Sequence, residues 1–253
     1  GLTDKFNALQ ETCVLLFGNE VSWGGSRAAR DVLFNDTAGV KRLVERKGVD
    51  KTEVNNYTRY RLASNDKRPA PVERGDRRFL ILKSRNIAAD YPDGNKDAGY
   101  RDYFTKLAGA ANDHSVVAQF VEAILRRDIS DFNIYRAPDT SDKYDVLERG
   151  LDDESKWLLS IARQGAVIDD DGHQGFTGDL SADCSVEIEK NVVYGSAQGF
   201  LKQRDRALAT KCGQVLKSLQ PATTDRQHFH FPPLPDFRKW VSDLTGLPLD
   251  RCS

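Results

Sequence analysis

The feature that most constrains the fold of this 253-residue chain is a predicted strand, residues 56–62. It is followed by an asparagine, whose side chain is a short amide, and then by two consecutive arginines. Its polar and apolar side chains alternate, which is typical of a strand. Asn65 follows the strand, and Arg77 and Arg78 come directly before an apolar run, residues 79–82. An amide at a strand end can orient a water molecule or a phosphate, and an arginine can neutralise charge on a phosphoryl group in transfer. The pattern therefore indicates phosphate chemistry beside a sheet.

Simpler interpretations of the same residues stay open. Asn65 precedes Asp66 and can be an ordinary turn-forming residue. An Arg-Arg pair taken alone is usually part of a solvated loop. The position of this pair, soon after Asn65 and directly before an apolar run, makes the functional interpretation more specific.

A second strand is predicted upstream, where residues 12–17 form a short apolar run. Such a run is typical of a strand that is buried on both faces of a parallel sheet. It leads to Asn19 and Glu20, and open α/β sheets bind ligands at the carboxyl ends of their strands. Glu20 can act there as a general base, and Asn19 as a weaker, neutral contact to a magnesium ion or its waters. The alternative is an apolar strand that ends in a surface carboxylate.

The other patterns complete an α/β outline. Residues 26–34 predict a helix, 40–47 and 54–65 two strands around a turn at 48–51, and 79–82 another buried strand. We expect segments 13–17, 57–63 and 79–82 to be neighbours in one sheet, with Glu20 and Asn65 at the same edge. An exposed loop is expected over 89–99, and an amphipathic helix over 115–127 with Asn112 or Asp113 as its cap.

The pattern changes from residue 152 onward. Helices are predicted over 152–163, 196–203, 205–219 and 236–244, with a small hairpin over 223–231. A polar stretch, residues 139–145, is the candidate linker before this part. Helix, helix, ribbon and helix in this order favour a winged-helix module.

Composition limits the partners. Charged residues make up 30% and hydrophobic residues 39% of the chain, an ordinary balance for a soluble protein. The net charge is −1, so DNA would have to be bound by local basic patches. No apolar run reaches membrane-spanning length, so no membrane partner is expected. The four cysteines, which have no paired metal-ligand spacing, favour a cytoplasmic protein with free, buried thiols and without a zinc site: Cys13, Cys184, Cys212 and Cys252.

Two basic patches are candidate DNA-binding surfaces. Residues 41–61 hold seven basic and three acidic residues together with Tyr57 and Tyr60, which suits a single-stranded DNA track with cations for phosphates and rings for bases. The candidate contacts in this hairpin are Arg46, Lys47, Lys51 and Arg59. A second patch, a helix face for duplex or forked DNA, holds Lys202, Arg204, Arg206 and Lys211. A solvated charged hairpin and a plain amphipathic helix are the alternatives.

The order and spacing of these motifs resemble the superfamily 3 helicases of phages, plasmids and large DNA viruses, in particular the poxvirus-type primase-helicases. The resemblance spans residues 6–140 well and the remainder loosely. It implies an α/β fold in three parts: part of an AAA+-like ATPase core over 1–110, a helical segment and linker over 111–145, and a winged-helix-like α+β module over 151–253.

The same resemblance implies the site. ATP and Mg²⁺ would be the cofactors, with Asn19 and Glu20 as a Walker B-like pair that holds the metal and Asn65 as the sensor of the γ-phosphate. Arg77 or Arg78 would be an arginine finger that reaches the nucleotide of a neighbouring subunit. The basic hairpin would project into the pore of a ring, expected to be a hexamer, that moves along single-stranded DNA in the bacterial host cytoplasm.

The chain departs from this family in two respects. An amide, Asn19, replaces one carboxylate of the acidic pair, and no Gly-x-x-x-x-Gly-Lys-Ser/Thr phosphate loop is present. In relatives this loop lies upstream of the Walker B strand, so we expect the chain to begin after it and not to hydrolyse ATP efficiently alone. A non-catalytic DNA-binding or assembly module is the main alternative. An AAA+-like ATPase that acts on protein is a remoter one, which the basic hairpin with its tyrosines disfavours.

Overall fold

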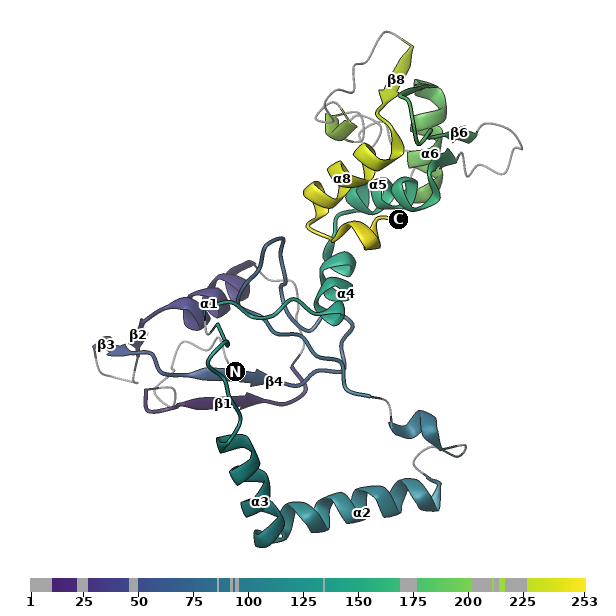
Figure 1. The fold of residues 1–253 in the computed structure, drawn as a ribbon. Coiled ribbons are helices and arrows are strands. Elements are labelled where there is room, and N and C mark those ends of the chain that lie inside the picture. The colour runs from purple at the N-terminus through teal and green to yellow at the C-terminus, as the bar shows by residue number, and fades with distance from the viewer. Residues whose placement is uncertain are drawn as a thin grey trace. The chain divides into compact units, whose positions relative to one another are not determined.

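The computed structural model describes residues 11–21, 27–45, 50–85, 87–91, 93, 96–133, 135–168, 177–201, 211, 214–216 and 227–253. Over these residues, helices and short strands alternate in a mixed α/β arrangement (Figure 1). The chain divides into two compact units: unit 1 comprises residues 1–79 and 143–253, and unit 2 comprises residues 80–142. The domain boundaries expected from the sequence remain predictions.

The first part of unit 1 contains β1 (Leu15–Gly18), α1 (Arg27–Ala38), β2 (Lys41–Val44), β3 (Thr52–Asn55) and β4 (Arg59–Leu62). Strands β1 and β4 pair in parallel, with Leu15 opposite Arg59 and Gly18 opposite Leu62 (Figure 1). This confirms the prediction that the segments around residues 13–17 and 57–63 are neighbouring strands. Strand β1 therefore ends at the same sheet edge as β4.

The prediction of a third strand in this sheet, residues 79–82, is wrong, because these residues form no strand. Instead, side chains from further along the chain form hydrogen bonds with backbone groups of this segment. The Thr140 hydroxyl donates to the carbonyl of Ile81 at 2.7 Å, and the Asp142 carboxylate accepts the backbone N–H of Lys83 at 2.8 Å. With these groups already hydrogen-bonded, the segment does not need a neighbouring strand.

The expectation that β1 is buried on both faces is also wrong within the described structure. Leu15 is 62% exposed and Phe17 is 58% exposed. Successive side chains of a strand point to opposite faces, so these two residues share one face of the β1–β4 pair with their partners Arg59 and Arg61. In the part of the chain that the structure describes, β1 pairs with β4 alone, and no further layer covers this face.

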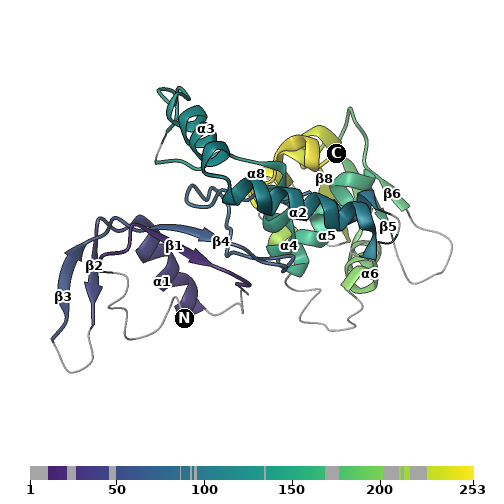
Figure 2. The same ribbon diagram turned by 90° about the horizontal axis from the view of Figure 1, so that it is seen from below.

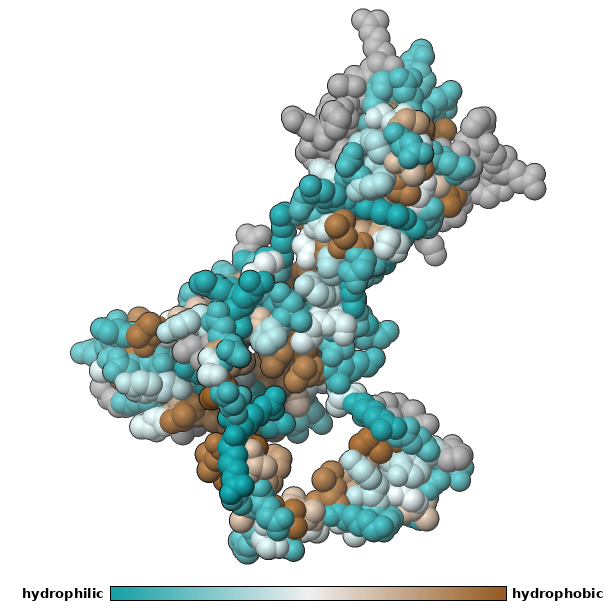
Figure 3. All heavy atoms as spheres, in the orientation of Figure 1, coloured by the Kyte–Doolittle hydropathy of each residue, from teal (hydrophilic) through white to brown (hydrophobic). Residues whose placement is uncertain are grey.

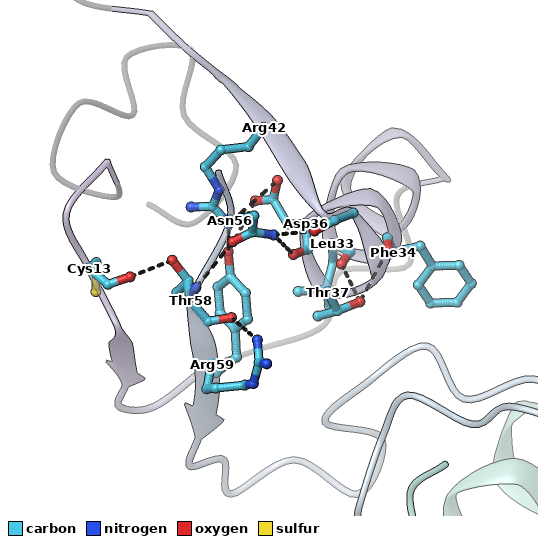
Figure 4. A network of polar contacts seen from close by, with 11 residues as sticks. Cys13, Leu33, Phe34, Asp36, Thr37, Arg42, Asn56, Thr58 and Arg59 are labelled. Atoms are coloured by element: carbon cyan, nitrogen blue, oxygen red, sulfur yellow. Dashed lines mark hydrogen bonds and ion pairs between the residues drawn. The ribbon is translucent and has the colours of Figure 1, made fainter. Parts of the chain in front are cut away.

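Strands β2 and β3 form the predicted antiparallel hairpin and lie side by side in both views (Figures 1 and 2). The expected single strand over 54–65, however, is divided into β3 and β4 by residues 56–58. Asn56 causes the break, because its side-chain amide donates to the carbonyls of Asp36 and Gly39 at 2.6 and 2.9 Å. Thr58 then donates from its hydroxyl to the carbonyl of Cys13 at 2.7 Å, which directs the chain into pairing with β1 (Figure 4).

Unit 2 contains a short 3-10 helix, η2 (Ile87–Asp90), followed by α2 (Ala98–Asn112) and α3 (His114–Leu125). Helix α3 confirms the helix predicted over 115–127, and the Asp113 carboxylate caps it by accepting the backbone N–H of Ser115 at 2.8 Å. Helix α2 was not predicted. Neither helix has a buried residue, and apolar side chains lie on the surface of both (Figure 3). The helices α2 and α3 therefore do not bury their apolar side chains against each other.

Helix α4 (Ser141–Gly150) begins in the last two residues of unit 2 and continues into the second part of unit 1. That part also contains α5 (Asp153–Gln164), β5 (Ala166–Ile168), β6 (Thr177–Asp179), β7 (Val186–Glu189), α6 (Lys190–Leu201), β8 (His228–Phe231), α8 (Leu234–Thr245) and the 3-10 helix η4 (Leu249–Arg251). Helix α5 has the expected bounds, since Asp152 caps its start and Gly165, with φ +67°, ends it. The last helix, α8, is confirmed as well. The polar stretch 139–145, the expected linker, is helical from Ser141 onward, because α4 begins there and buries Val146 and Leu147; its role as a domain boundary stays a prediction.

The hairpin expected over 223–231 lies partly outside the described residues, and its described part pairs elsewhere. Strand β8 pairs with β7 in antiparallel order, with Phe229 opposite Ile188. Phe229 and Phe231 alternate with histidines and are 2% and 1% exposed, so the inner face of β8 belongs to the core. The predicted helix 196–203 is the end of α6, and most of the predicted helix 205–219 lies outside the described residues.

An ion pair ties α4 to α5 and gives a pH-dependent contribution to stability. The two terminal guanidinium nitrogens of Arg163, Nη1 and Nη2, donate to the Glu148 carboxylate at 2.7 and 2.9 Å. The hydrogen bond from Arg163 lowers the pKa of Glu148. A carboxylate whose pKa is depressed by folding stabilises the protein above its unfolded pKa, and this contribution is lost as pH falls through the folded pKa.

We therefore expect Glu148→Gln to lower the free energy of unfolding by about 1 kcal/mol at pH 7, the upper end for a partly exposed ion pair. The difference from the parent should decrease in acid, as Glu148 of the parent becomes protonated. Urea unfolding followed by tryptophan fluorescence at pH 7 and pH 3 measures both values. Asp243→Asn, at an exposed carboxylate on α8, is the control. An equal loss of stability at both pH values would contradict the ion-pair account.

Candidate functional site

The predicted polar residues after β1 and β4 lie at one sheet edge. The ladder continues past the strands, because the N–H of Ala63 donates to Gly18 at 2.8 Å and the N–H of Val21 donates back to Ala63 at 2.9 Å. These bonds hold the segments that carry Glu20 and Asn65 beside each other. The structure thus brings together the two residues that the sequence placed at one edge.

Backbone strain marks the β1 side of this edge. Glu20 has φ +53°, and it is the only residue other than glycine with a positive φ in the described part of the chain. For a side chain with a Cβ atom this conformation costs about 1–3 kcal/mol and is concentrated at functional sites. The hydrogen bonds of Gly18 and Val21 on either side hold the conformation in place.

The polar side chains of this edge are exposed. The turn after β4 is closed by Ser64, whose hydroxyl accepts the backbone N–H of Asp66 at 3.0 Å. Asn65 is the central residue of this turn, and its amide makes no hydrogen bond within the described residues. Its functional role stays a prediction.

The donor set at this edge suits a magnesium ion that arrives with a nucleotide. Asn19 and Glu20 offer an amide oxygen and a carboxylate, the oxygen ligands that Mg²⁺ prefers. Across the ranges that the structure describes, no group of three or more His, Cys, Asp or Glu side chains could hold a metal. Mg²⁺ is usually bound through one or two carboxylates plus substrate phosphates, so this pair fits such an ion without forming a complete protein cage. When bound, the ion would neutralise phosphate charge.

The segment 73–79, called here the arginine turn, has a defined geometry. The N–H of Asp76 donates to Glu73 at 3.0 Å, with Gly75 at φ +68° in the position that requires a positive angle. The Asp76 carboxylate then accepts the N–H groups of Arg78 and Phe79 at 2.8 and 3.0 Å. Sequence reasoning did not single out Asp76, although a Gly-Asp pair is a recognised turn signal.

The two arginines of this turn differ in their surroundings. The guanidinium of Arg78 lies 4.6 Å from the ring centroid of Phe34 in α1, and its Nη1 lies 3.7 Å from Oδ2 of Asp76. The Arg77 side chain is exposed and has no hydrogen bond or ion pair among the described residues. Likewise, neither arginine is bonded to Glu20 or Asn65 there. Within one chain, the arginine turn and the sheet edge are thus two separate clusters.

The candidate DNA-binding hairpin is described only in part. Arg46 and Lys47 lie outside the described residues. Lys51 pairs with Glu45 at 3.1 Å, and Lys41 pairs with Glu53 at 2.6 Å, so acidic neighbours offset both lysines.

One basic residue of the hairpin, Arg42, is structural. It is 6% exposed, and its Nη2 donates to the Tyr60 hydroxyl at 2.8 Å, which in turn donates to Asp36 at 3.3 Å (Figure 4). Burial raises the pKa of Tyr60. This network removes Arg42 and Tyr60 from the expected DNA track and leaves Tyr57, which is 65% exposed. The alternation with Val44, which is 1% exposed, is the sequence signal that Arg42 faces inward.

Little of the second basic patch is described. Lys202, Arg204 and Arg206 lie outside the described residues. Lys211 is exposed, and its Nζ lies 3.8 Å from Glu154 in α5. Its expected role in binding DNA stays a prediction. Cys13, Cys184 and Cys252 are free thiols, as expected, but their expected burial is confirmed only for Cys252, because Cys184 is exposed and Cys13 is half-buried. Cys212 lies outside the described residues. None of the described helices combines the length and apolar character that a membrane span requires.

Comparisons with known proteins identify one matching family model and several solved structures with a similar fold. The model of a family of unknown function, DUF5906, matches residues 1–78. No curated protein matches. Among solved structures, the apo C-terminal region of NrS-1 (residues 305–718) is similar, with a TM-score of 0.55 and 15% sequence identity over 92% of this chain and 58% of that one. The A form of the same region gives a TM-score of 0.56 at 14% identity, again over 92% of this chain and 58% of that one. This chain therefore shares the fold of the NrS-1 C-terminal region and spans 58% of its length.

Proposed function

We propose that this chain is the C-terminal part of an ATP-dependent replicative DNA helicase of the superfamily 3 type, which moves along single-stranded DNA in phage or mobile-element replication. The observation that carries the proposal is the parallel pairing of β1 with β4, which places Glu20 and Asn65 at one edge. The fold shared with the NrS-1 C-terminal region supports the architecture. The resemblance of the motifs to superfamily 3 helicases supports the activity.

Each residue has a distinct role in this proposal. Glu20 accepts the proton of the attacking water as general base. Asn65 orients that water or the γ-phosphate. Asn19 and Glu20 would hold Mg²⁺, and Asn19, which is neutral, contributes less than a second carboxylate would.

Assembly into a ring, expected to be a hexamer, completes the site. The arginine turn and the sheet edge are separate clusters within one chain, which supports the delivery of an arginine from a neighbouring subunit. The AAA+-like core and the winged-helix-like module belong to the same proposal. So do the cofactors ATP and Mg²⁺ and a single-stranded or forked DNA partner.

A longer form that includes the sequence encoded upstream of Gly1 tests the proposal. We expect this form to hydrolyse ATP in the presence of Mg²⁺ and to be stimulated by single-stranded DNA, because the proposal places the phosphate loop in the upstream part. The 253-residue chain alone should show at most weak hydrolysis. Absence of DNA-stimulated hydrolysis in the longer form would overturn the helicase proposal.

Binding of single-stranded DNA tests the basic hairpin. Lys47→Ala together with Lys51→Ala is expected to weaken binding almost independently of base sequence. Each lost phosphate contact should lower the slope of log affinity against log salt by roughly one unit. Fluorescence anisotropy titrations at several salt concentrations measure the slope, with Lys83→Ala plus Lys96→Ala as the matched control in unit 2. If the double variant binds DNA like the parent at low salt, the hairpin is not part of the DNA-binding surface.

A non-catalytic DNA-binding or assembly module is the second candidate function. The amide at Asn19 favours it, since the Walker B-like pair has only one carboxylate. Under this alternative, the longer form assembles and binds DNA but does not turn over ATP.

A further inference from the structure

Asp76 is placed to control both arginines of the arginine turn. Its side chain is 1% exposed. One carboxylate oxygen accepts the backbone N–H groups of Arg78 and Phe79, and the other lies 3.7 Å from the Arg78 guanidinium. That second oxygen is buried and has no hydrogen-bond partner in the described structure. A buried carboxylate oxygen in this state is costly, so stability alone does not explain the residue.

The turn is also fastened by residues outside it. Lys143 of α4 is 3% exposed and donates from Nζ to the backbone carbonyl of Asp76 at 2.5 Å. On the side of α1, the Phe34 ring lies against Arg78 and 6.0 Å from the Phe79 ring, between centroids. The backbone on both sides of Arg77 is therefore fixed, while the Arg77 side chain itself is exposed.

We propose that Asp76 is a positioning residue that anchors Arg78 within its own subunit and thereby presents Arg77 to the nucleotide site of a neighbouring subunit. This inference rests on the function proposed above. Arg78 is suited to the anchoring role because its guanidinium already lies over the Phe34 ring and beside the Asp76 carboxylate. Arg77 suits the outward role because no described residue bonds to it. Preorganising a guanidinium in this way reduces the cost of placing it against charge that develops in the transition state.

Kinetics of the longer form test the anchor. Asp76→Ala is expected to lower kcat for ATP hydrolysis about 10²-fold, the scale of a displaced catalytic group, with little change in KM. Asp76→Asn keeps an oxygen that can accept the two backbone N–H groups, so it should retain more activity than Asp76→Ala. Asp243→Ala removes an exposed carboxylate of α8 and should match the parent.

Mixed assemblies separate positioning from a general loss of structure. Because the defect of Asp76→Ala lies in the arginine that it presents to a neighbour, addition of Glu20→Gln subunits should raise activity above that of either variant alone. Unchanged kcat in Asp76→Ala, or a defect that Glu20→Gln subunits do not relieve while they relieve Arg77→Ala, would overturn this inference alone. An inactive parent would instead overturn the proposed function, and the role of Arg77 with it.

Discussion

Glutamine in place of Glu20 is expected to lower kcat for ATP hydrolysis by the longer form about 10²- to 10⁴-fold, the range that a general base contributes. The change removes the charge and the basic oxygen but keeps a side chain of the same size. Nucleotide affinity should therefore change much less than kcat. Steady-state hydrolysis gives kcat, and equilibrium binding of a fluorescent ATP analogue gives the affinity.

The surroundings of Glu20 make this test specific. Its backbone strain and the hydrogen bonds of Gly18 and Val21 fix the main chain, and none of them needs the side-chain charge. Glu122→Gln, at an exposed carboxylate on α3, is a matched control and should retain the parent kcat. A Glu20→Gln protein as active as the parent would remove Glu20 from the chemistry.

Alanine in place of Arg77 is expected to lower the hydrolysis rate about 10³-fold or more, while nucleotide binding stays nearly intact. An arginine finger meets charge that develops mainly in the transition state, so its loss affects rate more than ground-state affinity. Hydrolysis and binding are measured on the same longer form, with Arg85→Ala in unit 2 as the control.

Mixing shows whether Arg77 acts on a neighbouring subunit. In mixed rings of Arg77→Ala and Glu20→Gln subunits, some sites combine an intact Glu20 with an intact neighbouring arginine, so partial recovery is expected. Recovery would not occur if Arg77 acted within its own chain, because no chain in the mixture carries both residues. Full activity of both Arg77→Ala and Arg78→Ala would leave the turn as an ordinary basic loop.

Local patterns predicted the elements that depend on neighbouring residues in the chain. The alternation and the short apolar run predicted β4 and β1, and the parallel pairing that places Glu20 beside Asn65 followed from them. The helix predicted over 152–163 agrees with α5, whose end groups are satisfied locally by Asp152 and Gly165.

Features that depend on distant partners could not be predicted in this way. Side chains of Thr140 and Asp142 occupy backbone groups at 81 and 83, so a run that is apolar enough for a strand does not form one. The burial of Arg42 depends on Tyr60 and Asp36. Apolar periodicity predicted helix α3, but the pattern carries no information on what covers its exposed stripe.

The positions of Glu20 and Asn65 relative to a bound nucleotide test the central claim most directly. A structure of the longer form with Mg²⁺ and a non-hydrolysable ATP analogue would measure them. We predict that the Glu20 carboxylate and the Asn65 amide both lie within hydrogen-bonding reach of the γ-phosphate or of the water aligned with it. We also predict that Arg77 of an adjacent copy approaches the same phosphate. A nucleotide bound elsewhere, with Glu20 and Asn65 facing solvent, would contradict the account.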